Sequence, residues 1–120
     1  MKSIYDQFDA AFANVSAFSI TKGDERVGRV VIKFPKDGAG RLYAYVHVYG
    51  SSMVRGSASG YGYDKRSAAV IDAAKKLDHD DRDSKNAYHV SQTRIALQYD
   101  NGHDWTRHLE NAGYRVDQVI

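Results

Sequence analysis

Aromatic and basic side chains occupy every second position between residues 41 and 49. They are Arg41, Tyr43, Tyr45, His47 and Tyr49. The residues between them are all aliphatic. Alternation with a period of two is typical of a strand with one buried face, so the rings and the base are expected on the opposite face. Exposed rings interleaved with bases can stack on nucleobases or anchor a protein interface.

The segment 26–34 adds two more bases to the same predicted face. Its aliphatic positions Val30 and Ile32 alternate with Arg29 and Lys33, which again favours a strand with one buried side. The predicted partner-binding residues are therefore Tyr43, Tyr45, His47, Tyr49, Arg29 and Lys33. An alternative is that the C-terminal helices cover this face and turn it into a second core.

A second group of bases indicates a different chemistry. Lys65 and Arg66 follow the glycine-rich run Gly56–Gly62 and begin a predicted helix. The run lacks the Gly-Lys-Ser/Thr ending of a P-loop, so a packing and turn role is favoured over phosphate binding. If the protein binds nucleic acid directly, the expected contacts are Lys65, Arg66, Arg41 and Arg55. Counterion release would make such binding steeply salt-dependent.

Catalytic and metal-binding patterns are missing from the sequence. It has no cysteine, which excludes disulfides, thiol nucleophiles and cysteine-bound zinc. It also has no Gly-x-Ser-x-Gly or His-Glu-x-x-His motif. The acidic run 78–85, which includes His79, does not have EF-hand spacing and is interpreted as a solvated loop. His103 and His108 are five positions apart and would diverge on a helix. We therefore expect no enzyme activity, no cofactor and no metal.

The composition predicts one globular domain, residues 1–120. The chain has 17 basic and 15 acidic residues, and the resulting charge of +2 does not by itself indicate a nucleic-acid binder. No apolar run approaches the roughly 18 residues of a membrane span. The first residues lack the apolar core of a signal peptide. We expect a cytoplasmic protein without a membrane partner.

Hydrophobic periodicity predicts an α+β fold. An antiparallel four-stranded sheet is expected, with helices packed mainly on one face, in the order α-β-β-β-β-α followed by a helical extension and a final strand. The expected helices cover residues 3–14, 65–77, 88–98 and 104–112. The expected strands cover residues 16–22, 26–34, 41–49, 53–61 and 114–119.

Two of the helices have specific sequence signals. In 65–77, Asp64 is a candidate N-cap, and the buried stripe is Val70, Ala73, Ala74 and Leu77. Its alanines predict tight packing on the Gly-Ser-Ala segment of the fourth strand. In 104–112, the expected apolar stripe is Trp105, Leu109 and Ala112, and Gly113 is expected to end the helix in a left-handed conformation.

The segments Tyr45–Gly50, Gly56–Gly62 and Lys65–Ala69 together resemble part of a double-stranded-RNA-binding domain. Those domains run helix, three strands, helix, an order similar to that predicted over residues 3–77. In that family, basic residues at the start of the last helix bind phosphate. The resemblance implies that Lys65 and Arg66 have this role and that duplex RNA is the ligand.

Gly60-Tyr61-Gly62-Tyr63-Asp64-Lys65 and Asn111–Val116 resemble segments of small accessory proteins of phages and other mobile elements. These proteins include inhibitors of bacterial defence, among them anti-CRISPR proteins, which typically act by stoichiometric binding. This resemblance implies a non-enzymatic inhibitor in the host cytoplasm that blocks a bacterial defence protein or ribonucleoprotein complex. The oligomeric state stays open.

Overall fold

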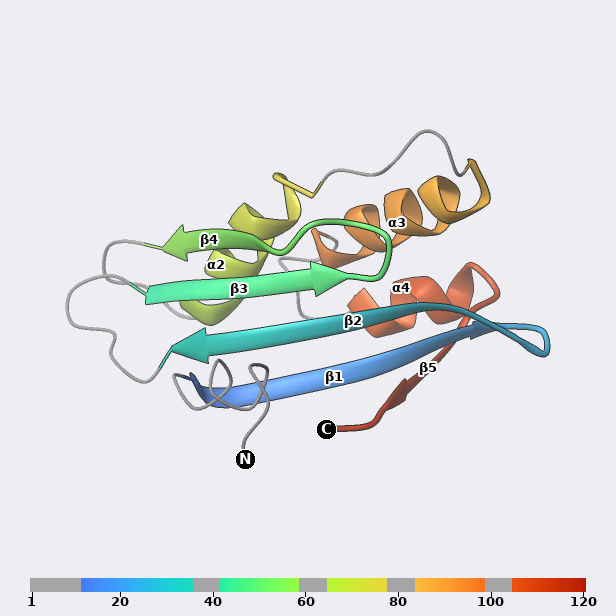
Figure 1. The fold of residues 1–120 in the computed structure, drawn as a ribbon, viewed down its shortest axis with the longest axis horizontal. Coiled ribbons are helices and arrows are strands. Elements are labelled where there is room, and N and C mark those ends of the chain that lie inside the picture. Colours follow the sequence, from blue (N-terminus) through green and yellow to red (C-terminus); the bar gives the residue numbers. More distant parts are fainter. Residues whose placement is uncertain (1–11, 36–41, 59–64, 78–83, 99–104) are drawn as a thin grey trace, which may run out of the picture.

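The computed structural model describes residues 12–35, 42–58, 65–77, 84–98 and 105–120. In these ranges five strands form one antiparallel sheet, and three helices pack on one of its faces (Figure 1). The elements are β1 (Phe12–Lys22), β2 (Glu25–Pro35), β3 (Leu42–Val48), β4 (Val54–Ala58), α2 (Lys65–Ala74), α3 (Ser84–Leu97), α4 (Trp105–Asn111) and β5 (Arg115–Gln118). The predicted α+β class is confirmed.

The long hairpin β1–β2 forms the middle of the sheet. Gly23 has a φ of +64°, a left-handed conformation that glycine adopts without strain and that closes the turn after β1. The register places Phe18 opposite Val30 and Ser16 opposite Ile32. These four residues therefore lie on the same face of the sheet, toward the helices.

The sheet has five strands, one more than expected. The strands lie in the order β4-β3-β2-β1-β5. The final strand β5 returns to pair antiparallel with β1, with Phe18 opposite Gln118 and Thr21 opposite Arg115. The segment predicted as the final strand thus joins the same sheet, as an edge strand next to β1.

The predicted helix over residues 3–14 is wrong at its end. Phe12 and Asn14 are extended in β1, where they pair with Pro35 and Phe34 of β2. Pairing with a neighbouring strand outweighs the local helical spacing of apolar residues at these positions, as tertiary context often does. Residues 3–11 lie outside the described residues.

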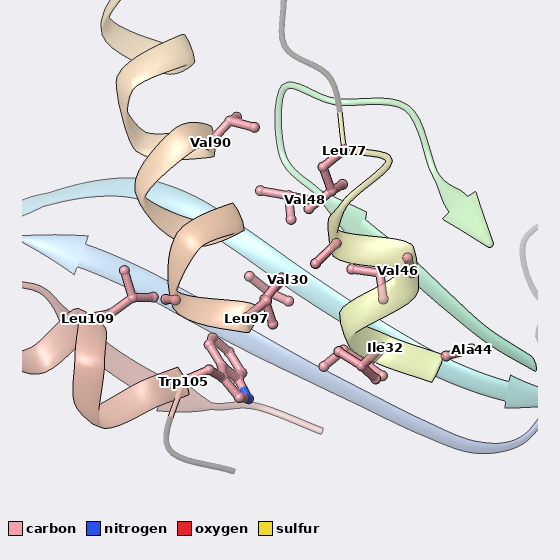
Figure 2. Close-up of a cluster of buried hydrophobic side chains, with 14 of the residues drawn as sticks. Val30, Ile32, Ala44, Val46, Val48, Leu77, Val90, Leu97, Trp105 and Leu109 are labelled. Carbon is pink, nitrogen blue, oxygen red and sulfur yellow. The ribbon is translucent and has the colours of Figure 1, made fainter. Parts of the chain in front are cut away.

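The core lies between the sheet and the helices (Figure 2). The sheet contributes buried aliphatic side chains at alternate positions of β2 and β3, which confirms the two predicted faces of these strands. The helices contribute apolar residues from α2, α3 and α4. The labelled core residues are Val30, Ile32, Ala44, Val46, Val48, Leu77, Val90, Leu97, Trp105 and Leu109.

Helix α2 packs closely on β4, as its alanines predict. A Cβ atom on Gly56 would overlap the carbonyl oxygen of Ala69 and the amide nitrogen of Ala73, and would lie 2.8 Å from the Cα of Ala73. Only a glycine on β4 leaves room for the backbone of α2 at this distance. The predicted stripe is buried as well: Val70, Ala73 and Ala74 of α2, and Leu77, which follows the end of the helix.

The C-terminal helices are also largely as expected. The segment predicted as a helix over 88–98 is helical to Leu97, within α3, which begins earlier, at Ser84. Trp105 and Leu109 of α4 are buried, whereas Ala112 is exposed, contrary to the prediction. Gly113 has the expected positive φ, +96°, and it turns the chain so that Tyr114 takes the buried position.

Candidate binding surface

The sheet face opposite α2, α3 and α4, here called the outer face, carries the predicted aromatic residues. Tyr43, Tyr45 and His47 project from β3 and are partly exposed, and the aliphatic residues between them point to the core. Tyr49, just after β3, is 62% exposed. The three described helices pack on the other face (Figure 2). The alternative in which the C-terminal helices cover these rings is therefore wrong.

A basic-aromatic-basic row crosses three strands of the outer face. Lys33 on β2 pairs with Tyr45 on β3, and Tyr45 pairs with Arg55 on β4. Directly paired residues have Cβ atoms roughly 4.5–5.5 Å apart. Tyr45 thus lies between Lys33 and Arg55, which are on the adjacent strands at the same level of the sheet.

Arg55 also contacts the neighbouring tyrosine. The central carbon of its guanidinium group lies 4.9 Å from the centre of the Tyr43 ring, within cation–π distance. From the sequence alone, Arg55 is expected among the contacts of the nucleic-acid-binding alternative, apart from the tyrosines. The structure places it among them, because β4 pairs with β3 in a register that puts Ser57 opposite Tyr43 and Arg55 opposite Tyr45.

Arg29 and Tyr49 lie at one end of the outer face. Arg29 is exposed on β2, and its carbonyl oxygen accepts a hydrogen bond of 2.9 Å from the backbone N–H of Tyr49. This bond ties the residue after β3 to β2. The six residues predicted for partner binding therefore come from two adjacent strands and the turn that follows: Arg29, Lys33, Tyr43, Tyr45, His47 and Tyr49.

His47 is held by the turn that follows β3. Its Nε2 lies 3.1 Å from the carbonyl oxygen of Ser51, and the Ser51 hydroxyl donates to the carbonyl of Val48 at 2.7 Å. A carbonyl oxygen only accepts, so Nε2 carries a proton in this arrangement. The ring therefore has a fixed orientation on the outer face.

Of the four residues of the nucleic-acid-binding alternative, Arg55 and Arg66 have described side chains, and these two lie apart. The guanidinium carbon of Arg66 lies 4.9 Å from the centre of the Phe34 ring, and Phe34 packs against the core on the helix side of the sheet. Arg55 is on the outer face. Lys65 is the first residue of α2, but its side chain lies outside the described part of the chain. All of Arg41 lies outside it as well. The two bases whose side chains are described thus lie on opposite sides of the sheet.

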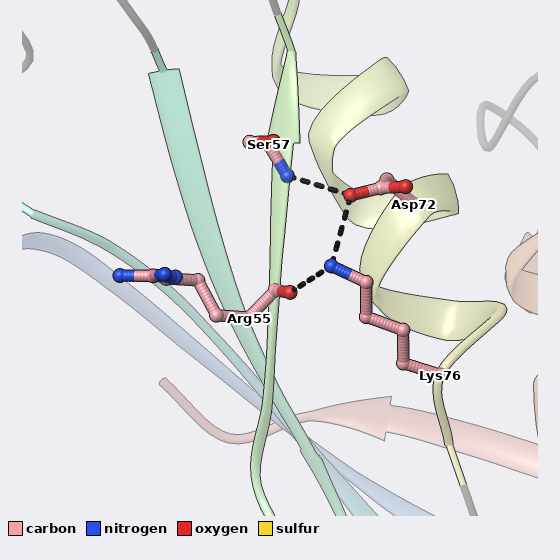
Figure 3. Close-up of polar contacts among 4 residues, drawn as sticks. All are labelled: Arg55, Ser57, Asp72 and Lys76. Atoms are coloured by element: carbon pink, nitrogen blue, oxygen red, sulfur yellow. Dashed lines mark hydrogen bonds and ion pairs between the residues drawn. The ribbon is translucent and has the colours of Figure 1, made fainter.

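Two side chains, one on α2 and one just after its last residue, hold the backbone of β4 in place (Figure 3). The backbone N–H of Ser57 donates to Asp72 Oδ2 at 2.9 Å, and Lys76 Nζ donates to the carbonyl of Arg55 at 2.9 Å. Asp72 and Lys76, here called the edge clamp, also form an ion pair of 3.3 Å. The pKa of Asp72 is held below its ordinary value, mainly by the hydrogen bond from the Ser57 N–H and to a smaller extent by the hydrogen bond and charge of Lys76. The edge clamp thereby positions the strand that carries Arg55.

A shallow hollow of about 170 Å³ opens on the helix side of the sheet. It lies between α2, α4 and the first two strands, and Arg66 is at its rim. It is smaller than the usual ligand pocket of roughly 300–1,000 Å³. Its lining is mostly apolar: Ser16, Phe18, Ile32, Phe34, Arg66, Ser67, Val70 and Trp105.

A polar cluster that the sequence does not predict lies between α3 and the start of β5. The Tyr114 hydroxyl and His89 Nδ1 share a hydrogen bond of 2.8 Å, and Lys22 Nζ lies 4.8 Å from the centre of the Tyr114 ring. Burial raises the pKa of the Tyr114 phenol. No local signal could have revealed this contact, because the three residues come from distant parts of the chain.

Within the described ranges, no group of three or more histidine, aspartate or glutamate side chains is arranged to hold a metal ion. Residues 78–83 of the acidic run, which include His79, lie outside those ranges, and its last two residues, Ser84 and Lys85, begin α3 instead of continuing a loop. None of the described helices is long and apolar enough to span a membrane.

Comparison with protein-family models, curated proteins and solved structures finds no match for this chain.

Proposed function

We propose that this chain is a small, non-catalytic mobile-element protein that binds a bacterial defence protein or its ribonucleoprotein complex through the outer face. In this proposal it blocks the target sterically, in the manner of an anti-CRISPR protein. The observation that carries the proposal is the row of Lys33, Tyr45 and Arg55 across three adjacent strands. The phage or mobile-element origin rests on the resemblance described above.

The chemistry of the row suits a protein interface. Tyrosine and arginine are enriched among the residues that dominate binding energy, because a large ring or a planar guanidinium gives much contact area at low entropic cost. Tyr43 and Tyr49 widen the aromatic area beside Tyr45. The cations of Lys33 and Arg55 would steer an acidic partner toward it.

The position of these residues on a sheet also matters. Side chains on paired strands are held by the backbone hydrogen bonds of the sheet, so less order is lost on binding than in a loop. The edge clamp fixes β4, and the turn contacts of His47 and Ser51 fix the end of β3. A preorganised surface of this kind fits an inhibitor that occludes its target without turnover.

Direct binding of single-stranded nucleic acid is the second candidate. The same row favours it, because a base stacked on Tyr45 would have its flanking phosphates near Lys33 and Arg55. This mode would use the outer face, and not Lys65 and Arg66 as in a double-stranded-RNA-binding domain.

Fluorescence anisotropy with labelled single-stranded and duplex RNA and DNA separates the two candidates. Measurements at about 50 and 200 mM salt reveal any contribution of phosphate contacts, since each neutralised phosphate steepens the salt dependence. The protein-inhibitor proposal predicts no binding at the lower salt concentration. Binding that weakens steeply with salt, and that Tyr45→Ala abolishes, would establish the second candidate instead.

A further inference from the structure

The two edge strands of the sheet differ in how their outward backbone groups are used. On β4, the carbonyl of Arg55 and the N–H of Ser57 point away from β3, and the edge clamp bonds both of them (Figure 3). An edge whose hydrogen-bonding groups are occupied is a poor template for another strand.

On β5 the outward groups have no such partner among the described elements. The N–H of Val119 donates to the carbonyl of Ala17 at 2.8 Å, so residue 119 faces β1. Because successive residues of a strand direct these groups to opposite edges, the N–H and C=O of Val116 and Gln118 point away from β1. The surrounding chain is open to solvent: Val119 is 57% and Ile120 is 60% exposed.

The charges on β5 are arranged to match a second copy of the same strand. Arg115 and Asp117 project from the same face, and Arg115 Nε lies 2.9 Å from Asp117 Oδ2. If two copies of β5 pair antiparallel about Val116, Arg115 of each copy lies directly opposite Asp117 of the other. Opposite charges in this position stabilise a strand pair.

The symmetric register about Asp117, shifted by one residue, is unfavourable. Pairing about Asp117 would place the two Asp117 carboxylates directly opposite each other, and like charges there destabilise a strand pair. The register about Val116 also pairs the outward N–H and C=O of Val116 with those of its symmetry mate. The sequence of β5 therefore favours one register over the other.

We propose that β5 is a homodimer interface, in which two copies pair antiparallel about Val116 and join their sheets edge to edge. The twofold axis of such a strand pair is perpendicular to the sheet, so the outer faces of both copies point the same way. The interaction is isologous, as in most soluble homodimers. Because β5 is only four residues long, we expect a reversible dimer whose population depends on concentration.

Sedimentation equilibrium from about 1 μM to about 1 mM protein tests this proposal. The weight-average mass should rise with concentration from the chain mass of 13.4 kDa toward twice that value. Asp117→Arg turns both cross-strand pairs into repulsive ones and should raise the dimer Kd at least about tenfold. The double exchange Arg115→Asp with Asp117→Arg should restore the wild-type Kd to within about threefold.

Glu110→Arg is the matched control, since it changes the charge by the same amount at an exposed site on α4. It should leave the dimer Kd unchanged. Hydrogen exchange of the wild-type protein gives an independent readout, because dimerisation should slow exchange of the Val116 and Gln118 amides as the concentration rises. A protein that stays monomeric at 1 mM, or a double exchange that dimerises no better than Asp117→Arg, would overturn the proposal. Neither result depends on the partner that the outer face binds.

Discussion

The backbone of α2 at Ala73 lies directly against Gly56 of β4. A Cβ atom on Gly56 would come within 2.8 Å of the Ala73 Cα and would overlap the Ala73 amide nitrogen. The atoms in the way belong to the backbone and not to a flexible side chain, so neither element can yield by changing a rotamer. This contact determines how close the helix layer lies to the strand that carries Arg55.

Gly56→Ala should therefore destabilise the protein strongly. Overpacking usually costs about 1–3 kcal/mol, and we expect a cost of about 3 kcal/mol or more here because the backbone of α2 would have to move. Urea unfolding followed by far-UV circular dichroism measures the loss. Gly28→Ala is the matched control, since its Cβ would lie 3.6 Å from Ile20 Cβ, an ordinary contact distance. Equal stability of the two variants would show that the close approach is absent.

Removal of the Asp72 carboxylate should lower the free energy of unfolding by less than Gly56→Ala does, and by an amount that depends on pH. In Asp72→Ala the Ser57 N–H and Lys76 lose their shared acceptor, and we expect a loss of about 1 kcal/mol at pH 7. The side chain of Asp72 is 40% exposed, so solvent screening keeps the contribution of its charge small.

The pH dependence follows from the lowered pKa of Asp72. A carboxyl whose pKa is lower in the folded than in the unfolded protein stabilises the fold fully above the unfolded value, here about 3.8. This contribution is lost as the pH falls through the lower, folded pKa. Urea unfolding of the wild type and Asp72→Ala should thus differ most at neutral pH and converge in acid. A difference that grows with acidification would contradict the role assigned to Asp72.

Trp105 is expected to be the main anchor of α4. It is buried and meets the Phe18 ring of β1 edge to face, with ring centres 4.8 Å apart and an interplanar angle of 84°. Trp105→Ala should cost about 3–5 kcal/mol, whereas Trp105→Phe keeps a ring against Phe18 and should cost about 1–2 kcal/mol. Urea unfolding measures both, and equal losses for the two variants would argue against the ring contact.

Much of the sheet could be predicted from local patterns. The strict alternation around Tyr45 reports a strand with one buried face, and that face is buried by the helices as expected. The alanines of α2 and the glycine of β4 correctly indicated close packing between them. These features are visible in the sequence because the burial of one face imposes a period of two on a strand and of 3.6 on a helix.

The missed features depend on contacts between distant parts of the chain. The pairing of β5 with β1 follows from the path of the three helices between them, which no local period encodes. Arg55 joins Tyr43 through the register of β3 and β4, and that register is set by the turn between them. Phe12 was assigned to a helix because its spacing from other apolar residues fits one, yet it pairs with Pro35 in the sheet.

Under the proposed function, Tyr45, which lies between Lys33 and Arg55, is the residue expected to anchor the protein partner. Tyr88→Ala is the matched control, because Tyr88 is a 53% exposed tyrosine on α3, away from the outer face. Tyr45→Ala and Tyr88→Ala should both keep the wild-type far-UV circular dichroism spectrum and a cooperative unfolding transition.

The most direct test is affinity capture from a bacterial lysate with the wild-type protein, Tyr45→Ala and Tyr88→Ala, quantified by mass spectrometry. We expect the wild type and Tyr88→Ala to enrich the same defence protein or complex, and Tyr45→Ala, although folded, to capture at least about tenfold less of it. Equal capture of that target by Tyr45→Ala and Tyr88→Ala would show that Tyr45 does not anchor the partner.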